Sequence, residues 1–122
     1  MIRLYLLTNA ALYVLFAVWC TVKANDTAQS LGYTQRNPSG HSEYLVIYGG
    51  LQLGLAFCFA WLATKPELHR TGAILSLLFY APLVLYRLAT VAKYWPVSTL
   101  TLGTGALELL LLVGAMVLVA RT

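Results

Sequence analysis

Four long stretches of this sequence carry either no charged side chain or a single one, and they constrain the fold more than any other feature. They run over about residues 4–22, 44–63, 71–92 and 97–120. About 20 residues of α-helix cross the roughly 30 Å hydrocarbon layer of a bilayer. The sequence therefore predicts an all-α integral membrane protein, an up-down-up-down four-helix bundle that forms one domain over residues 1–122.

The composition agrees with a chain whose main solvent is lipid. Of 122 residues, 60% are hydrophobic and only 10% are charged, whereas about a quarter of the residues of a soluble protein are charged. So short a soluble chain could not hide that much apolar surface. The net charge of +4 is spread thinly, without a basic run that would indicate nucleic acid. Basic residues near the ends of the spans fit contact with anionic lipid headgroups, so the lipid bilayer is the predicted partner.

The long loop over residues 23–42 carries the signals of a short interfacial helix near residues 27–31. Asp26 and Gln29 have the spacing of a capping box, which satisfies the free N–H groups at a helix start. Gly32 follows as a stop, because glycine tolerates the left-handed backbone that ends many helices.

The second span is expected to begin after residues 37–40, Asn-Pro-Ser-Gly, which are typical of a turn. Ser42 can cap the helix and Glu43 would lie in its first turn, near the positive end of the helix dipole.

Three glycines of the second span are predicted to pack against a neighbouring helix. Gly50 and Gly54 have the spacing that lets two membrane helices approach closely, and Gly49 precedes them.

Two charged side chains lie inside the apolar stretches at similar predicted depth. Arg87 lies about five residues before the third span ends, and Glu108 about ten residues into the fourth. An ionisable group this deep costs at least about 2.5–3.5 kcal/mol, and such groups usually pair or line a cavity. We therefore predict an ion pair between Arg87 and Glu108, capped from the loop side by Glu43.

Other polar residues have helical spacing with these charges, which predicts a pocket open toward the long loop. Tyr48 and Gln52 follow Glu43 along the second span, and Tyr80 lies two turns before Arg87. The alternative is a polar network that only holds the helices in register. The candidate pocket residues are Glu43, Tyr48, Gln52, Tyr80, Arg87 and Glu108.

The sequence resembles a family of small bacterial four-helix membrane proteins catalogued as a domain of unknown function, within the wider DoxX-like grouping. The residues that carry the resemblance are Leu31–Gly32, Glu43, Tyr48–Gly49–Gly50–Leu51 and Gly54. It implies an uncleaved inner-membrane protein. In the family pattern an arginine often stands two residues after the glutamate. Here that residue is Leu45, which leaves Arg87 as the expected partner of Glu43.

Three functions remain open. The leading hypothesis is a non-catalytic accessory or assembly subunit of a larger membrane complex or homo-oligomer, since the sequence contains no recognisable catalytic set, and DoxX-like proteins include such subunits. The second is a binder or carrier of a lipid, sterol-like molecule or quinone at Arg87 and Glu108. The third is an enzyme with Glu43 or Glu108 as acid or base.

Neither a cofactor nor a metal is predicted, because a metal site needs three or four convergent ligands. The expected location is the bacterial inner membrane. A slight excess of basic residues on one side favours a cytoplasmic N-terminus.

Overall fold

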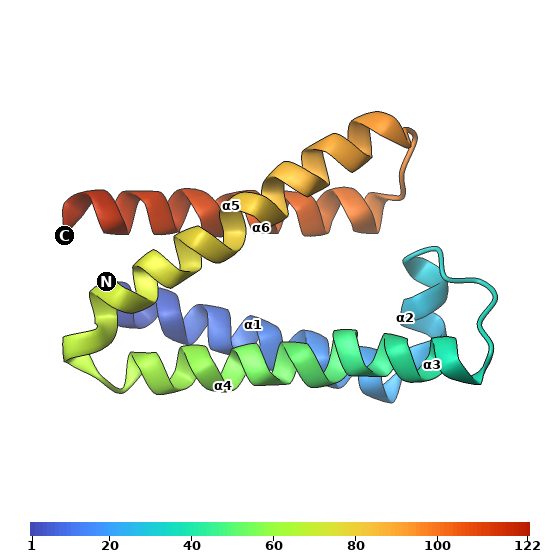
Figure 1. Cartoon of the computed structure of the whole chain (residues 1–122), viewed down its shortest axis with the longest axis horizontal. Coiled ribbons are helices and arrows are strands. Elements are labelled where there is room, and N and C mark those ends of the chain that lie inside the picture. Colours follow the sequence, from blue (N-terminus) through green and yellow to red (C-terminus); the bar gives the residue numbers. More distant parts are fainter.

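The chain is helical along most of its length in a computed structural model that describes residues 1–122 (Figure 1). Four helical segments are long and apolar enough to cross a membrane, which confirms the predicted all-α, four-helix membrane architecture. The first segment is α1 (Ile2–Val22) and the last is α6 (Thr99–Arg121). The second consists of α3 (Pro38–Leu45), a π-helical stretch η1 (Val46–Leu51) and α4 (Gln52–Ala63). The third consists of the short η2 (Pro66–Leu68) and α5 (His69–Lys93).

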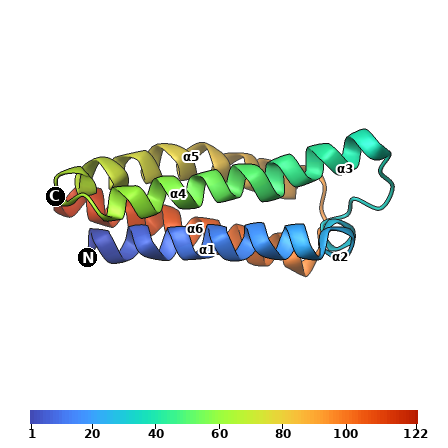
Figure 2. The same cartoon turned by 90° about the horizontal axis from the view of Figure 1, so that it is seen from below.

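The four segments run alternately up and down but pack as two pairs. Helices α1 and α4 share most of their contacts with each other, and so do α5 and α6. Figure 1 shows α5 starting close to α1 and α4 at one end of the molecule and rising away from them, crossing α6 on its way to the other end; Figure 2 shows all four running lengthwise. The bundle is therefore two helical hairpins that meet at one end and separate toward the other.

Small residues allow the close approach where the hairpins meet. A Cβ atom built on Gly72 of α5 would lie 3.0 Å from both terminal methyl groups of Leu6 in α1. On α6, a Cβ on Gly114 would lie 3.0 Å from the ring of Tyr5. The Tyr5 hydroxyl then donates to the carbonyl oxygen of Leu111 at 2.7 Å. We call this region the closed end.

A polar contact adds to the packing between the hairpins. The hydroxyl of Tyr80 in α5 donates to Oδ1 of Asn9 in α1, and both side chains are fully buried. The Tyr80 hydroxyl also lies 3.1 Å from the hydroxyl of Tyr13. The amide nitrogen of Asn9 donates a hydrogen bond to the carbonyl oxygen of Tyr5 at 2.9 Å. Such satisfied polar groups fix how one helix sits against another.

The loop after α1 contains the expected short helix, with a different start. Helix α2 spans Ala24–Ser30 and follows Lys23, with no side-chain cap, so the predicted role of Asp26 and Gln29 as a capping box is wrong. Gly32 follows it with φ +95°, the left-handed backbone expected of a stop.

The second span begins earlier than predicted. Helix α3 starts at Pro38, and the Asn37 side chain accepts a hydrogen bond from the Gly40 backbone N–H at 2.8 Å. Proline at the first helical position has a suitable φ and lacks only an N–H that would be free anyway. Ser42 is therefore inside the helix and does not cap it.

Only one of the three glycines predicted for helix packing does so within the chain. A Cβ on Gly49 would come 2.8 Å from Oγ1 of Thr21 in α1, so this glycine sets the α1 contact. No neighbouring atom lies within 4 Å of a Cβ on Gly50 or Gly54, and both are exposed. The Gly50–Gly54 face points away from the bundle.

Candidate functional site

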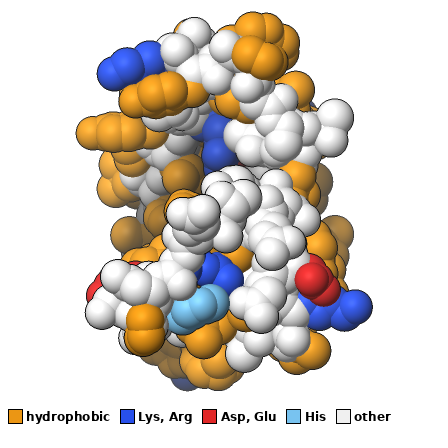
Figure 3. Space-filling model, turned by 90° about the vertical axis from the view of Figure 1, so that its right-hand side faces the viewer, with side chains coloured by type: hydrophobic (Ala, Val, Ile, Leu, Met, Phe, Trp, Pro, Cys, Tyr) orange, Lys and Arg blue, Asp and Glu red, His pale blue; other side chains and the backbone are white.

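A cavity of about 270 Å³ lies between the two hairpins, on the side where they separate. Of the 21 residues that line it, 16 are hydrophobic. They come from α1, α2, η1, α4, α5 and α6, so both hairpins contribute walls. Figure 3 looks at the loop end of the molecule and shows a surface that is hollowed in two places, with basic side chains recessed in the hollows.

Arg87 of α5 and Glu108 of α6 form the charged part of the cavity wall. The Arg87 Nη2 atom lies 2.7 Å from Glu108 Oε1, and Nε lies 2.9 Å from Oε2. The predicted pairing is therefore present, in a two-bond geometry that fixes both side chains. The side chains are 29% and 12% exposed, respectively. The other guanidinium nitrogen, Nη1, makes no hydrogen bond in the protein.

Gly105, three residues before Glu108, makes room for this pair. A Cβ at Gly105 would lie 3.2 Å from Cγ of Arg87 and 3.4 Å from Cδ. The stem of Arg87 therefore lies against the bare backbone of α6 and reaches Glu108 side-on.

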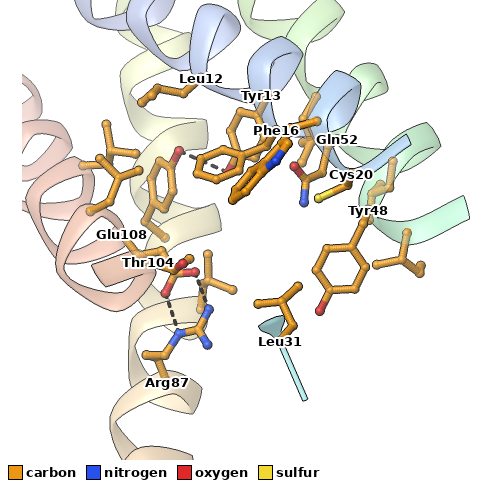
Figure 4. A pocket seen from close by; sticks show the side chains of 18 of the residues that line it. Leu12, Tyr13, Phe16, Cys20, Leu31, Tyr48, Gln52, Arg87, Thr104 and Glu108 are labelled. Carbon is orange, nitrogen blue, oxygen red and sulfur yellow. Dashed lines mark hydrogen bonds and ion pairs between the residues drawn. The ribbon is translucent and has the colours of Figure 1, made fainter. Parts of the chain in front are cut away.

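Tyr48 and Gln52 supply polar groups from the other hairpin. Figure 4 shows both across the cavity from Arg87. The Gln52 Oε1 atom is buried, and the amide makes no hydrogen bond in the protein. Tyr48 belongs to η1, and its hydroxyl lies 3.2 Å from that of Tyr33 in the loop. Short π-helical stretches of this kind recur at functional sites.

Sequence reasoning missed the aromatic wall. Tyr13, Phe16 and Trp19 of α1 line the cavity together with Phe79 of α5. Tyr13 also stacks on Phe59 of α4, with ring centroids 5.8 Å apart. The spacing of three in residues 13, 16 and 19 was a usable signal for one helix face.

Five of the six predicted pocket residues line this cavity, namely Tyr48, Gln52, Tyr80, Arg87 and Glu108. Glu43 does not. Its neighbour Tyr44 occupies the buried face of α3 and donates a hydrogen bond to Thr27 Oγ1 at 2.8 Å, which leaves Glu43 exposed. The prediction that Glu43 caps the ion pair is therefore wrong.

Comparison with known proteins gives one match. The family model of DUF4345, a domain of unknown function, matches residues 1–119. No curated protein and no solved structure matches the chain.

Proposed function

The chain belongs to the DUF4345 family of unknown function, and we propose that this small membrane protein binds a lipophilic molecule between its two hairpins. The observation that carries the proposal is the cavity of about 270 Å³, mainly hydrophobic yet holding a few fixed polar groups. Pockets for small molecules have this make-up: apolar walls supply affinity and few polar groups set orientation.

The polar groups favour an uncharged head on the ligand. Arg87 and Glu108 neutralise each other, so an anion beside them would have to compete with Glu108 for the guanidinium. A carbonyl or hydroxyl oxygen can instead accept from the free Nη1 of Arg87. The amide of Gln52, which has no partner in the protein, lies across the cavity from Arg87 and can donate a hydrogen bond to the ligand or accept one from it. A quinone, a sterol-like molecule and a neutral lipid all meet these requirements.

The proposal assigns binding or transport of this molecule, with no chemical step. Both carboxylate oxygens of Glu108 accept hydrogen bonds from Arg87, and Glu43 lies outside the cavity. These contacts suit Arg87 as the group that orients the head, with Glu108 as the residue that positions Arg87.

Filling the cavity should weaken binding at least tenfold, or about 1.4 kcal/mol. Leu83→Phe adds volume to the α5 wall of the cavity, whereas Leu85→Phe makes the same change on the outer side of α5, where Leu85 is 66% exposed. The measurement is emission from Trp19, a cavity residue, with Trp61 and Trp95 replaced by phenylalanine.

Three probes cover the ligand class: a decyl-benzoquinone, a sterol and a short-chain diacylglycerol. We expect at least one probe to change Trp19 emission saturably. Its affinity should be weakened by Leu83→Phe and unchanged by Leu85→Phe. A chain that retains only Trp95 is the control for partition into the detergent. The proposal fails if none of the probes gives a saturable response, or if the two phenylalanine variants behave alike.

A second candidate function, an accessory or assembly subunit of a larger complex or homo-oligomer, is supported by the outward glycine face of the second span. Because nothing in the chain covers Gly50 and Gly54, another membrane helix can approach the backbone there. We expect Gly54→Leu to remove crosslinked species that the wild type forms in native membranes. Gly103→Leu is the matched control, since Gly103 also has no neighbour within 4 Å. A wild type without crosslinked species, or equal loss in both variants, contradicts this candidate.

A further inference from the structure

A second hollow, of about 330 Å³, lies on the loop side of the molecule. We call it the loop hollow. It shares Ile47 and Tyr48 with the cavity between the hairpins but otherwise has its own walls. The residues that line it are Tyr33, Arg36, Gly40, Glu43, Tyr44, Ile47 and Tyr48.

Arg36 is held in the loop hollow by three contacts. Its Nη2 atom donates to Oδ1 of Asn25 at 3.1 Å. Its guanidinium carbon lies 4.9 Å from the centre of the Tyr44 ring. A Cβ on Gly40 would lie 3.3 Å from the Cβ of Arg36, so the absence of a side chain there lets the arginine stem lie against α3. The guanidinium is thus placed before any ligand arrives.

One nitrogen of this fixed guanidinium has no partner. Nη1 of Arg36 is buried and makes no hydrogen bond. A buried donor left unsatisfied costs about 1–3 kcal/mol, and more where the group is charged. Arg36 also lines the hollow and has no carboxylate partner in the chain, so its charge favours an anionic group from outside the chain.

The loop hollow also holds an unpaired carboxylate. The Glu43 side chain lines it but forms neither a salt bridge nor a hydrogen bond; the salt bridge of the structure joins Arg87 and Glu108. A positive and a negative group thus face the same space without meeting. A simple anion would be repelled by Glu43, and a simple cation by Arg36. A molecule that carries both charges on a short spacer satisfies the two residues together.

The loop hollow lies at the loop end of the spans, where the headgroup layer of a bilayer begins. Tyr33, Tyr44 and Tyr48 gather there, and tyrosine is enriched at membrane interfaces. We propose that the loop hollow binds the head of a phospholipid with a primary ammonium group. The phosphodiester lies against the guanidinium of Arg36, and the ammonium lies against Glu43. This site is separate from the one proposed for the lipophilic ligand.

The test uses the full chain in nanodiscs of phosphatidylethanolamine, phosphatidylglycerol and phosphatidylcholine with identical acyl chains in equal amounts. Native mass spectrometry then measures which lipid stays bound. We expect phosphatidylethanolamine to be retained at least fivefold over the other two. Glu43→Gln should abolish that preference while phospholipid still binds, and Arg36→Gln should reduce the retention of all three lipids.

Glu67→Gln and Arg70→Gln are matched controls, because they make the same changes at the opposite end of the bundle, in η2 and at the start of α5. If Arg36→Gln does not fold, Glu43→Gln decides alone, since Glu43 is exposed and unbonded. Equal retention of the three lipids overturns the proposal, as does an unchanged preference in Glu43→Gln. A separate titration with inorganic phosphate and with ethanolamine overturns it if either binds as tightly as the short-chain phospholipid.

Discussion

Replacing Arg87 by leucine is expected to destabilise the protein by about 3 kcal/mol, and replacing Glu108 by leucine should cost a similar amount. Either change leaves the other charge unpaired beside an apolar cavity, whereas the double change removes both charges. The double variant should therefore be more stable than either single variant. The 29% exposure of the Arg87 side chain puts the expected cost at the low end for a buried pair.

Reversible denaturation of the detergent-solubilised protein measures these differences. Arg70→Leu is the control for losing an arginine, because Arg70 is exposed and forms no salt bridge; it should change the free energy of unfolding by less than about 0.5 kcal/mol. Additive losses in the double variant would mean that Arg87 and Glu108 do not act as a pair.

Valine in place of Gly72 is expected to cost about 2 kcal/mol and to part the two hairpins at the closed end. The added Cβ would lie 3.0 Å from both terminal methyl groups of Leu6, which is itself fully buried. The same denaturation measurement applies, together with the distance between spin labels on α1 and α5.

Two further variants separate a clash from a general effect of valine. Gly103→Val adds the same side chain where no atom lies within 4 Å, and it should be nearly neutral. Leu6→Ala removes the clashing methyl groups, so Gly72→Val should cost less in the Leu6→Ala background than in the wild type. If Gly72→Val costs the same in both backgrounds, the cost does not come from this contact.

The four spans and the Arg87–Glu108 contact could be predicted because lipid allows few alternatives. A spanning helix needs a continuous apolar run, and each such run in the sequence became a helix. A charge inside such a run needs a partner, and the third and fourth spans offered one of each sign at similar depth.

The orientation of the helix faces could not be predicted from the same signals. In a soluble protein the polar side of a helix reveals its outside, but here lipid and the protein interior are both apolar. Gly50 and Gly54 therefore looked like packing residues although they face outward. Tyr13, Phe16 and Trp19 could equally have faced lipid. Glu43 was misplaced because its neighbour Tyr44 takes the buried face of α3, and helical spacing alone did not show which of the two faces inward.

The division into two hairpins has a consequence for how the protein is made. The first hairpin is complete once residues 1–63 have left the ribosome, before α5 and α6 exist, and segments of a chain generally fold as they are synthesised. The cavity between the hairpins takes walls from both of them, so it is formed only when the second docks on the first. Under the proposed function, a ligand that fills the cavity would stabilise the docked state by mass action. Maturation in the membrane and ligand supply would thereby be linked, and a chain made without the proposed ligand would spend more time as two loosely joined halves open to membrane proteases.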